Sequence, residues 1–87
     1  MLKLRTTEFN GGKICSVIYN DDTWYLASDF FASIGITDEL EQIKALREIP
    51  VKEWKILVCY DPVSRDMMPA KFISSAGVLS FLAKRGV

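Results

Sequence analysis

Seven basic residues in the second half of the chain have the type and spacing to contact phosphate groups. Residues 1–39 carry three basic and six acidic side chains, whereas residues 40–87 carry eight basic and five acidic side chains. A surface built by the second half would therefore be positive and could attract a polyanion. The sequence predicts nucleic-acid contact at Lys44, Arg47, Lys52, Lys55, Lys71, Lys84 and Arg85.

The net charge of the whole chain does not favour nucleic-acid binding. Eleven Lys and Arg balance eleven Asp and Glu, and strong sequence-independent binding to nucleic acid usually needs an excess of cations. Exposed charges also form ion pairs on helices, for example Lys44 with Glu48 four residues later. From the sequence, phosphate contact and ordinary solvation of these side chains both stay open.

Groups for catalysis or metal binding are scarce. The chain has no histidine, and its two cysteines, Cys15 and Cys59, form no C-x-x-C pair. Asp29 has no second carboxylate at a spacing that would pair with it for acid–base chemistry. We therefore expect no enzymatic activity, no metal and no cofactor, and we expect both cysteines to be buried thiols.

Aromatic and methionine side chains around one expected hairpin offer a different kind of site. Such side chains are common in protein interfaces, and methionine adapts to irregular partners. The residues concerned are Trp54, Tyr60, Met67 and Met68. The chain could thus be a protein-interaction module that contacts no nucleic acid, or a homodimer with paired hairpin edges.

Length and composition predict a single domain over residues 1–87. The chain is 49% hydrophobic, enough for a core, although a domain of this size buries only about 60–65% of its unfolded surface and is marginally stable. No run approaches the ~18 apolar residues of a membrane span. The first residues also lack the apolar stretch of a secretory signal. We expect no membrane contact and a cytoplasmic location.

Alternating apolar residues and turn signals predict five strands. Residues 6–9 and 14–19 flank Asn10 and Gly11, which accept positive φ angles in a turn. A second turn leads to a short strand at 24–26, so the first three strands form a meander. Residues 54–60 and 67–73 predict a hairpin, in which Pro69 favours an edge because it has no N–H for the ladder.

Helical spacing predicts three helices. The first spans 27–34, with Ser28 as its cap and Gly35 as its stop. The second spans 38–48, capped by Thr37 or Asp38, and the third begins at Ser74 or Ser75. The expected buried stripes are Leu40, Ile43 and Leu46 in the second helix, and Val78, Leu79, Phe81 and Leu82 in the third.

The resulting order, β-β-β-α-α-β-β-α, predicts an α+β fold. In it, small antiparallel sheet elements (a meander plus a hairpin) pack with three helices.

Two segments carry a resemblance to a known family. Residues 24–35 form a strand that runs into a short helix ending at glycine, and residues 71–82 form a strand that runs into a glycine-bearing helix. With the strand at 14–19, this pattern resembles the Bro-N domain of baculovirus repeated-ORF proteins and phage antirepressors, across about residues 14–86. Tyr25 stands where the family usually has phenylalanine, and the segment 37–55 lacks the histidine often found there. The resemblance implies a DNA-binding regulatory domain acting in phage or prophage gene expression. The alternative within the same family is a protein-interaction module that inhibits a repressor or host protein without contacting nucleic acid.

Overall fold

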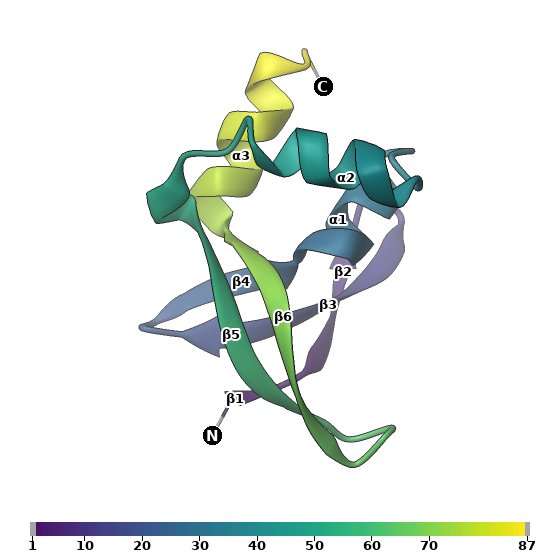
Figure 1. The fold of residues 1–87 in the computed structure, drawn as a ribbon, viewed down its shortest axis with the longest axis vertical. Coiled ribbons are helices and arrows are strands. Elements are labelled where there is room, and N and C mark those ends of the chain that lie inside the picture. The colour runs from purple at the N-terminus through teal and green to yellow at the C-terminus, as the bar shows by residue number, and fades with distance from the viewer. Residues whose placement is uncertain (1, 87) are drawn as a thin grey trace.

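The computed structural model describes residues 2–86, which form six strands, three α-helices and one 3-10 turn (Figure 1). The strands are β1 (Leu2–Lys3), β2 (Arg5–Phe9), β3 (Gly12–Tyr19), β4 (Asp22–Leu26), β5 (Trp54–Asp61) and β6 (Asp66–Ser74). The helices are α1 (Ala27–Ser33), α2 (Glu39–Leu46), the 3-10 turn η1 (Val51–Glu53) and α3 (Ser75–Lys84). The predicted α+β class and order are confirmed, and a two-residue strand, β1, precedes the expected ones.

The expected meander and hairpin are parts of one sheet with strand order β1-β5-β6-β4-β3-β2. Antiparallel pairing of β4 with β6, at Trp24 with Ser74 and at Leu26 with Phe72, joins them. The sheet is mixed because β1 runs parallel to β5, with Leu2 opposite Cys59. The short third strand of the meander is therefore a central strand.

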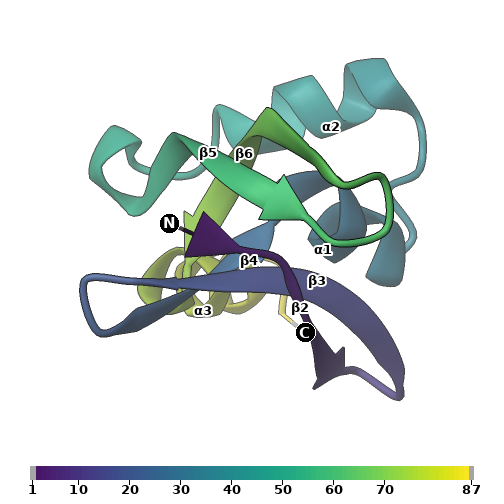
Figure 2. The ribbon, with the colours of Figure 1, turned by 90° about the horizontal axis from the view of Figure 1, so that it is seen from below.

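The sheet bends round on itself. β1 and β2 are separated only by Leu4, yet they lie at opposite ends of the strand order. The Leu4 backbone N–H donates to the Tyr60 carbonyl at 3.1 Å, so the N-terminal segment leaves β5 and crosses to β3 (Figure 2). This curvature encloses one face of the sheet without any helix.

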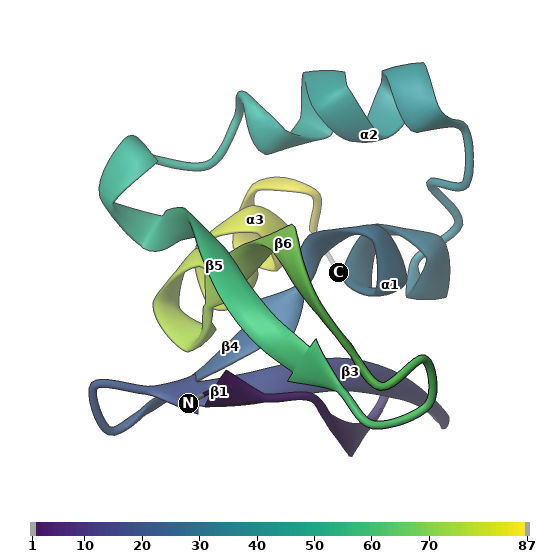
Figure 3. The same ribbon diagram turned by 60° about the horizontal axis from the view of Figure 1, so that its bottom comes forward.

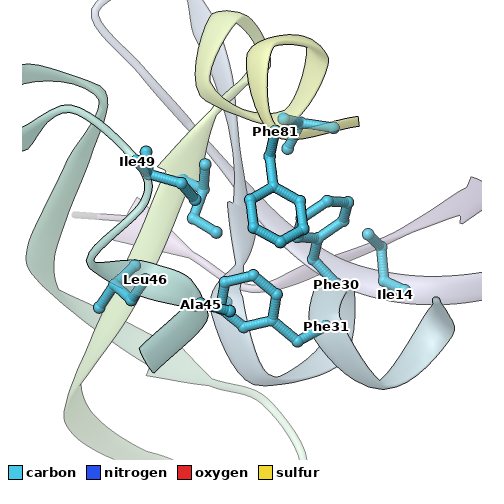
Figure 4. Packing of buried hydrophobic residues seen from close by; sticks show 10 residues of the cluster. Ile14, Phe30, Phe31, Ala45, Leu46, Ile49 and Phe81 are labelled. Atoms are coloured by element: carbon cyan, nitrogen blue, oxygen red, sulfur yellow. The ribbon is translucent and has the colours of Figure 1, made fainter. Parts of the chain in front are cut away.

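Two apolar cores lie on the two faces of the sheet. Inside the curve, Trp24, Cys59 and Phe72 pack with Val17 and Leu57. All three helices cover the outer face (Figure 3). There the rings of three phenylalanines meet, with centroids 5.4–5.9 Å apart (Figure 4). These rings are Phe30, Phe31 and Phe81, each at most 1% exposed.

Local side-chain chemistry positions the helices. α1 begins at Ala27 directly after β4, without a side-chain cap, so the predicted cap at Ser28 is wrong. The Asp29 carboxylate instead accepts from the Cys15 backbone N–H at 2.9 Å and fastens α1 to β3. The predicted caps at Asp38 and Ser74 are confirmed, because they accept from the N–H groups of Glu41 and Gly77.

None of the helices within residues 2–86 combines the length and the apolar character that crossing a bilayer requires.

Candidate functional site

An apolar groove of about 460 Å³ lies between α2 and the β5–β6 hairpin. On the helix side it is lined by Glu39, Gln42, Ile43 and Leu46, which are spaced at i, i+3, i+4 and i+7 and so share one face of α2. Phe31 of α1 also contributes. The volume falls within the ~300–1,000 Å³ typical of binding pockets in proteins.

The groove exists because α2 packs against the rest of the molecule through only part of its length. Within α2 only Ala45 and Leu46 are buried. The N-terminal part is held by the Gln42 amide, whose Nε2 donates to the carbonyl of Ile36 at 2.8 Å and of Ser28 at 3.4 Å. The predicted buried stripe of α2 is thus wrong at two of its three positions. Leu40 is 58% and Ile43 40% exposed.

The other wall of the groove belongs to the outward side of the hairpin. Cross-strand pairs place Ile56 opposite Lys71, Val58 opposite Pro69 and Tyr60 opposite Met67. Residues two apart on a strand share a face, so these six side chains form one surface, which we call the hairpin face. Ile56, Pro69 and Lys71 line the groove, and Ile56, Val58 and Met67 are 61%, 53% and 48% exposed. The groove therefore continues into an open apolar face.

The free edge of β6 runs beside this surface. β4 pairs with β6 only at Phe72, Ile73 and Ser74, because α1 starts directly after Leu26. Pro69 lies beyond that overlap, so the strand is central at one end and an edge at the other. The predicted edge position of this proline thus holds locally, although β6 as a whole lies between β5 and β4.

The seven basic residues predicted to contact nucleic acid are all exposed, but three of them already contact residues of α2 or of the turn that follows it. Lys44 pairs with Glu41 at 3.6 Å, and Arg85 pairs with Glu48 at 3.1 Å. Lys84 donates to the Glu48 backbone carbonyl at 3.2 Å. The predicted Lys44–Glu48 pair does not form, because α2 ends at Leu46 and the helical spacing no longer applies.

The remaining four basic residues make no ion pair with any other residue of the described range 2–86. Arg47, Lys52 and Lys55 follow one another from the end of α2 through η1 into β5. Lys55 lies 5.8 Å above the Trp24 ring, on the side of the sheet opposite to Lys71, because the two occupy alternate register positions. Three of the predicted residues thus lie close together along the chain, and the structure places Lys71 in the groove.

The four residues predicted for protein interaction divide between two faces. Tyr60 and Met67 lie opposite each other on the hairpin face. Trp54 shares that side but is half-buried against the helix-side core. Met68 pairs with Cys59 in the register and so points to the opposite side. Ile43, Ile56 and Val58 were not among the predicted site residues, although the alternation along residues 54–60 already placed the last two beside Tyr60.

Both cysteines are free, with Cys59 buried and Cys15 only half-buried. Burial raises the pKa of the Cys15 thiol to about 11, and hydrogen bonding to the Asp29 carboxylate and the charges of Asp29 and Asp61 add to the rise.

Cys15 is therefore expected to react slowly with iodoacetamide. At pH 8 a pKa of about 11 instead of 9.0 leaves roughly one hundredth of the thiolate of an ordinary cysteine. Asp29→Asn removes the nearby charge, so it should lower this pKa and speed alkylation of Cys15, measured by mass spectrometry at several pH values. Equal rates in the two proteins would show that Asp29 does not control the thiol. The change is conservative, because the amide oxygen of the new side chain can still accept from the Cys15 N–H.

Comparison of the chain with protein-family models, with curated proteins and with solved structures gives no match. The resemblance to Bro-N domains thus stays a prediction.

Proposed function

We propose that this chain is a regulatory docking domain that binds a partner protein through the groove and the hairpin face. The observation that carries the proposal is the continuity of the two surfaces. Ile43 on α2 and Ile56, Val58 and Met67 on the hairpin are each at least 40% exposed, and Ile43 and Ile56 face each other across the groove lining. Contiguous apolar patches of several hundred Å² on a small protein commonly mark interaction sites. With the resemblance to phage antirepressors, the expected partner is a repressor or a host protein.

Ile56→Glu is expected to weaken partner binding by about 10- to 100-fold, because it places a charge in the apolar contact. Partners would be selected from displayed protein fragments encoded by the source genome and its host, and their affinities measured by interferometry. Ile18→Glu is the matched control, since Ile18 is 51% exposed on β3, outside the groove. If every selected fragment binds the Ile56→Glu and wild-type chains equally well, the groove is not the docking site.

DNA binding is a second candidate, and the unpaired cations of residues 47–55 favour it. Arg47, Lys52 and Lys55 offer about three phosphate contacts, which predicts a slope near −3 for the logarithm of the binding constant against the logarithm of salt concentration. The resemblance to Bro-N domains supports the same function. Lys44 and Arg85 form ion pairs with Glu41 and Glu48, which reduces what these two cations could add to the affinity for DNA.

A duplex titration at two salt concentrations tests this candidate. We expect Arg47→Gln with Lys52→Gln to lower affinity about tenfold or more at low salt and to flatten the salt slope. The matched control, Lys44→Gln with Lys84→Gln, should leave the DNA affinity and its salt dependence nearly unchanged, because those amines already contact Glu41 and the Glu48 carbonyl. Absence of binding to duplex DNA at low salt would eliminate this function.

A further inference from the structure

The free edge of β6 limits how a partner can bind in the groove. The Leu4 N–H bonds to the Tyr60 carbonyl on the β1 side of β5. Successive residues of a strand point their backbone N–H and C=O groups to opposite sides, so those of Cys59 and Leu57 point toward β6 and face Met68 and Ala70. The backbone groups of Met67, Pro69 and Lys71 therefore turn to the open edge.

Pro69 interrupts that edge, because it has no N–H to donate. A strand added along β6 would find N–H donors only at Lys71 and Met67, with a gap between them. Proline and lysine on an edge are features that discourage strand addition. A helix satisfies its own backbone groups and needs only side-chain contact, so this surface suits a helix better than a strand.

The size of the apolar surface at the groove and the hairpin face also limits which kind of partner can bind there. Ile43, Ile56, Val58 and Met67 are 40–61% exposed, so together they offer apolar surface of roughly a few hundred Å². A stable complex between two folded copies usually buries about 800 Å² on each, of which about 56–65%, or roughly 450–520 Å², is apolar. The area is therefore small for a homodimer and sufficient for one face of a short helix.

The two walls of the groove carry side chains of opposite charge. Lys71 on β6 and Glu39 on α2 both line the groove, and neither forms an ion pair within residues 2–86. A partner with an acidic residue on one flank and a basic residue on the other would meet both, which would fix its orientation.

We infer that the groove binds an amphipathic helix of the partner protein, an inference that rests on the docking function proposed above. Its apolar residues would recur at i, i+3 or i+4 and i+7, the spacing with which a helix presents one face to a groove. An acidic side chain beside that face would pair with Lys71.

A random library of 16-residue peptides, displayed and selected on the full chain, tests this inference. Peptides that also bind the Ile56→Glu chain are removed, and Ile43→Glu on the opposite wall serves as a second groove variant. We expect the enriched peptides to have helical apolar spacing and to gain helical circular dichroism on binding. Thermal unfolding of each variant shows that it is folded.

Reversing the charge of Lys71 tests the expected ion pair with the acidic side chain of the peptide. Lys71→Glu should weaken the best peptide about tenfold, and replacing the acidic flank of that peptide by lysine should restore the affinity. Enrichment of groove-dependent peptides with alternating apolar residues that bind as strands would overturn the helix while leaving the docking function intact. If no peptide remains after those that also bind the Ile56→Glu chain are removed, both proposals fail. Self-association of the wild-type chain that Ile56→Glu abolishes would assign the groove to a second copy and overturn the inference.

Discussion

Phe81→Ala is expected to lower the free energy of unfolding by about 3–5 kcal/mol, as removal of a buried phenylalanine does in other cores. The Phe81 ring lies 5.9 Å from Phe30 and 5.4 Å from Phe31, both edge-on, and Arg85 lies 4.6 Å from it. Phe81 is the one aromatic residue of α3, so the cavity left by alanine would open at the centre of the helix-side core. Because small domains are stable by about 5–15 kcal/mol, much of the total would be lost.

Urea unfolding followed by circular dichroism measures this loss. The matched control is Leu79→Ala in the same helix, because Leu79 is 68% exposed and its truncation should cost less than about 1 kcal/mol. The same exposure shows that the predicted burial of Leu79 was wrong. If Phe81→Ala and Leu79→Ala prove equally stable, the position of α3 described here is incorrect.

Gly77→Ala is expected to destabilise the protein by about 1–3 kcal/mol, the usual effect of overpacking a core. In most helices this change is favourable by about 1 kcal/mol, because alanine has the higher helix propensity. Here a Cβ on Gly77 would lie 2.8 Å from Ile73 Cγ2 and 3.0 Å from both the Cβ and the backbone carbonyl oxygen of Glu53. The absence of a side chain at Gly77 thus lets η1 approach α3.

The melting temperature of Gly77→Ala should fall by about 5–20 °C, since 1 kcal/mol corresponds to ~4–8 °C in a domain of this size. Gly12→Ala is the control. Its Cβ would meet only the Phe9 carbonyl at 3.9 Å, so its melting temperature should change by at most a few degrees. An increased melting temperature for Gly77→Ala would contradict the close contact between η1 and α3.

Local patterns in the sequence were sufficient to predict most elements. Alternation over residues 54–60 and the turn at Asn10 and Gly11 are local signals, and the structure contains the corresponding strands. Two features depend on distant pairing instead. β1 is only two residues long and is a strand because it pairs with Cys59 and Tyr60. The join between β4 and β6 likewise involves residues about fifty positions apart.

The groove was harder to predict than the fold, because it depends on how far α2 packs onto the sheet. Helical spacing correctly places Ile43 and Leu46 on one face, but only Leu46 is buried. Nothing in the periodicity distinguishes a covered position from an uncovered one. The basic residues show the same limit. Their exposure was predictable, but the pairing of Arg85 with Glu48 joins α3 to the end of α2 and required the fold.

A ¹H–¹⁵N NMR titration of the full chain with the tightest-binding selected protein fragment shows whether a partner binds at the groove. Amide shift changes should concentrate at the residues that line the groove and at the hairpin face. We expect the largest changes at Ser28, Ile43, Ile56, Val58 and Lys71, and almost none at Ile18. Changes confined to Arg47, Lys52 and Lys55, with the groove unaffected, would contradict binding at the groove.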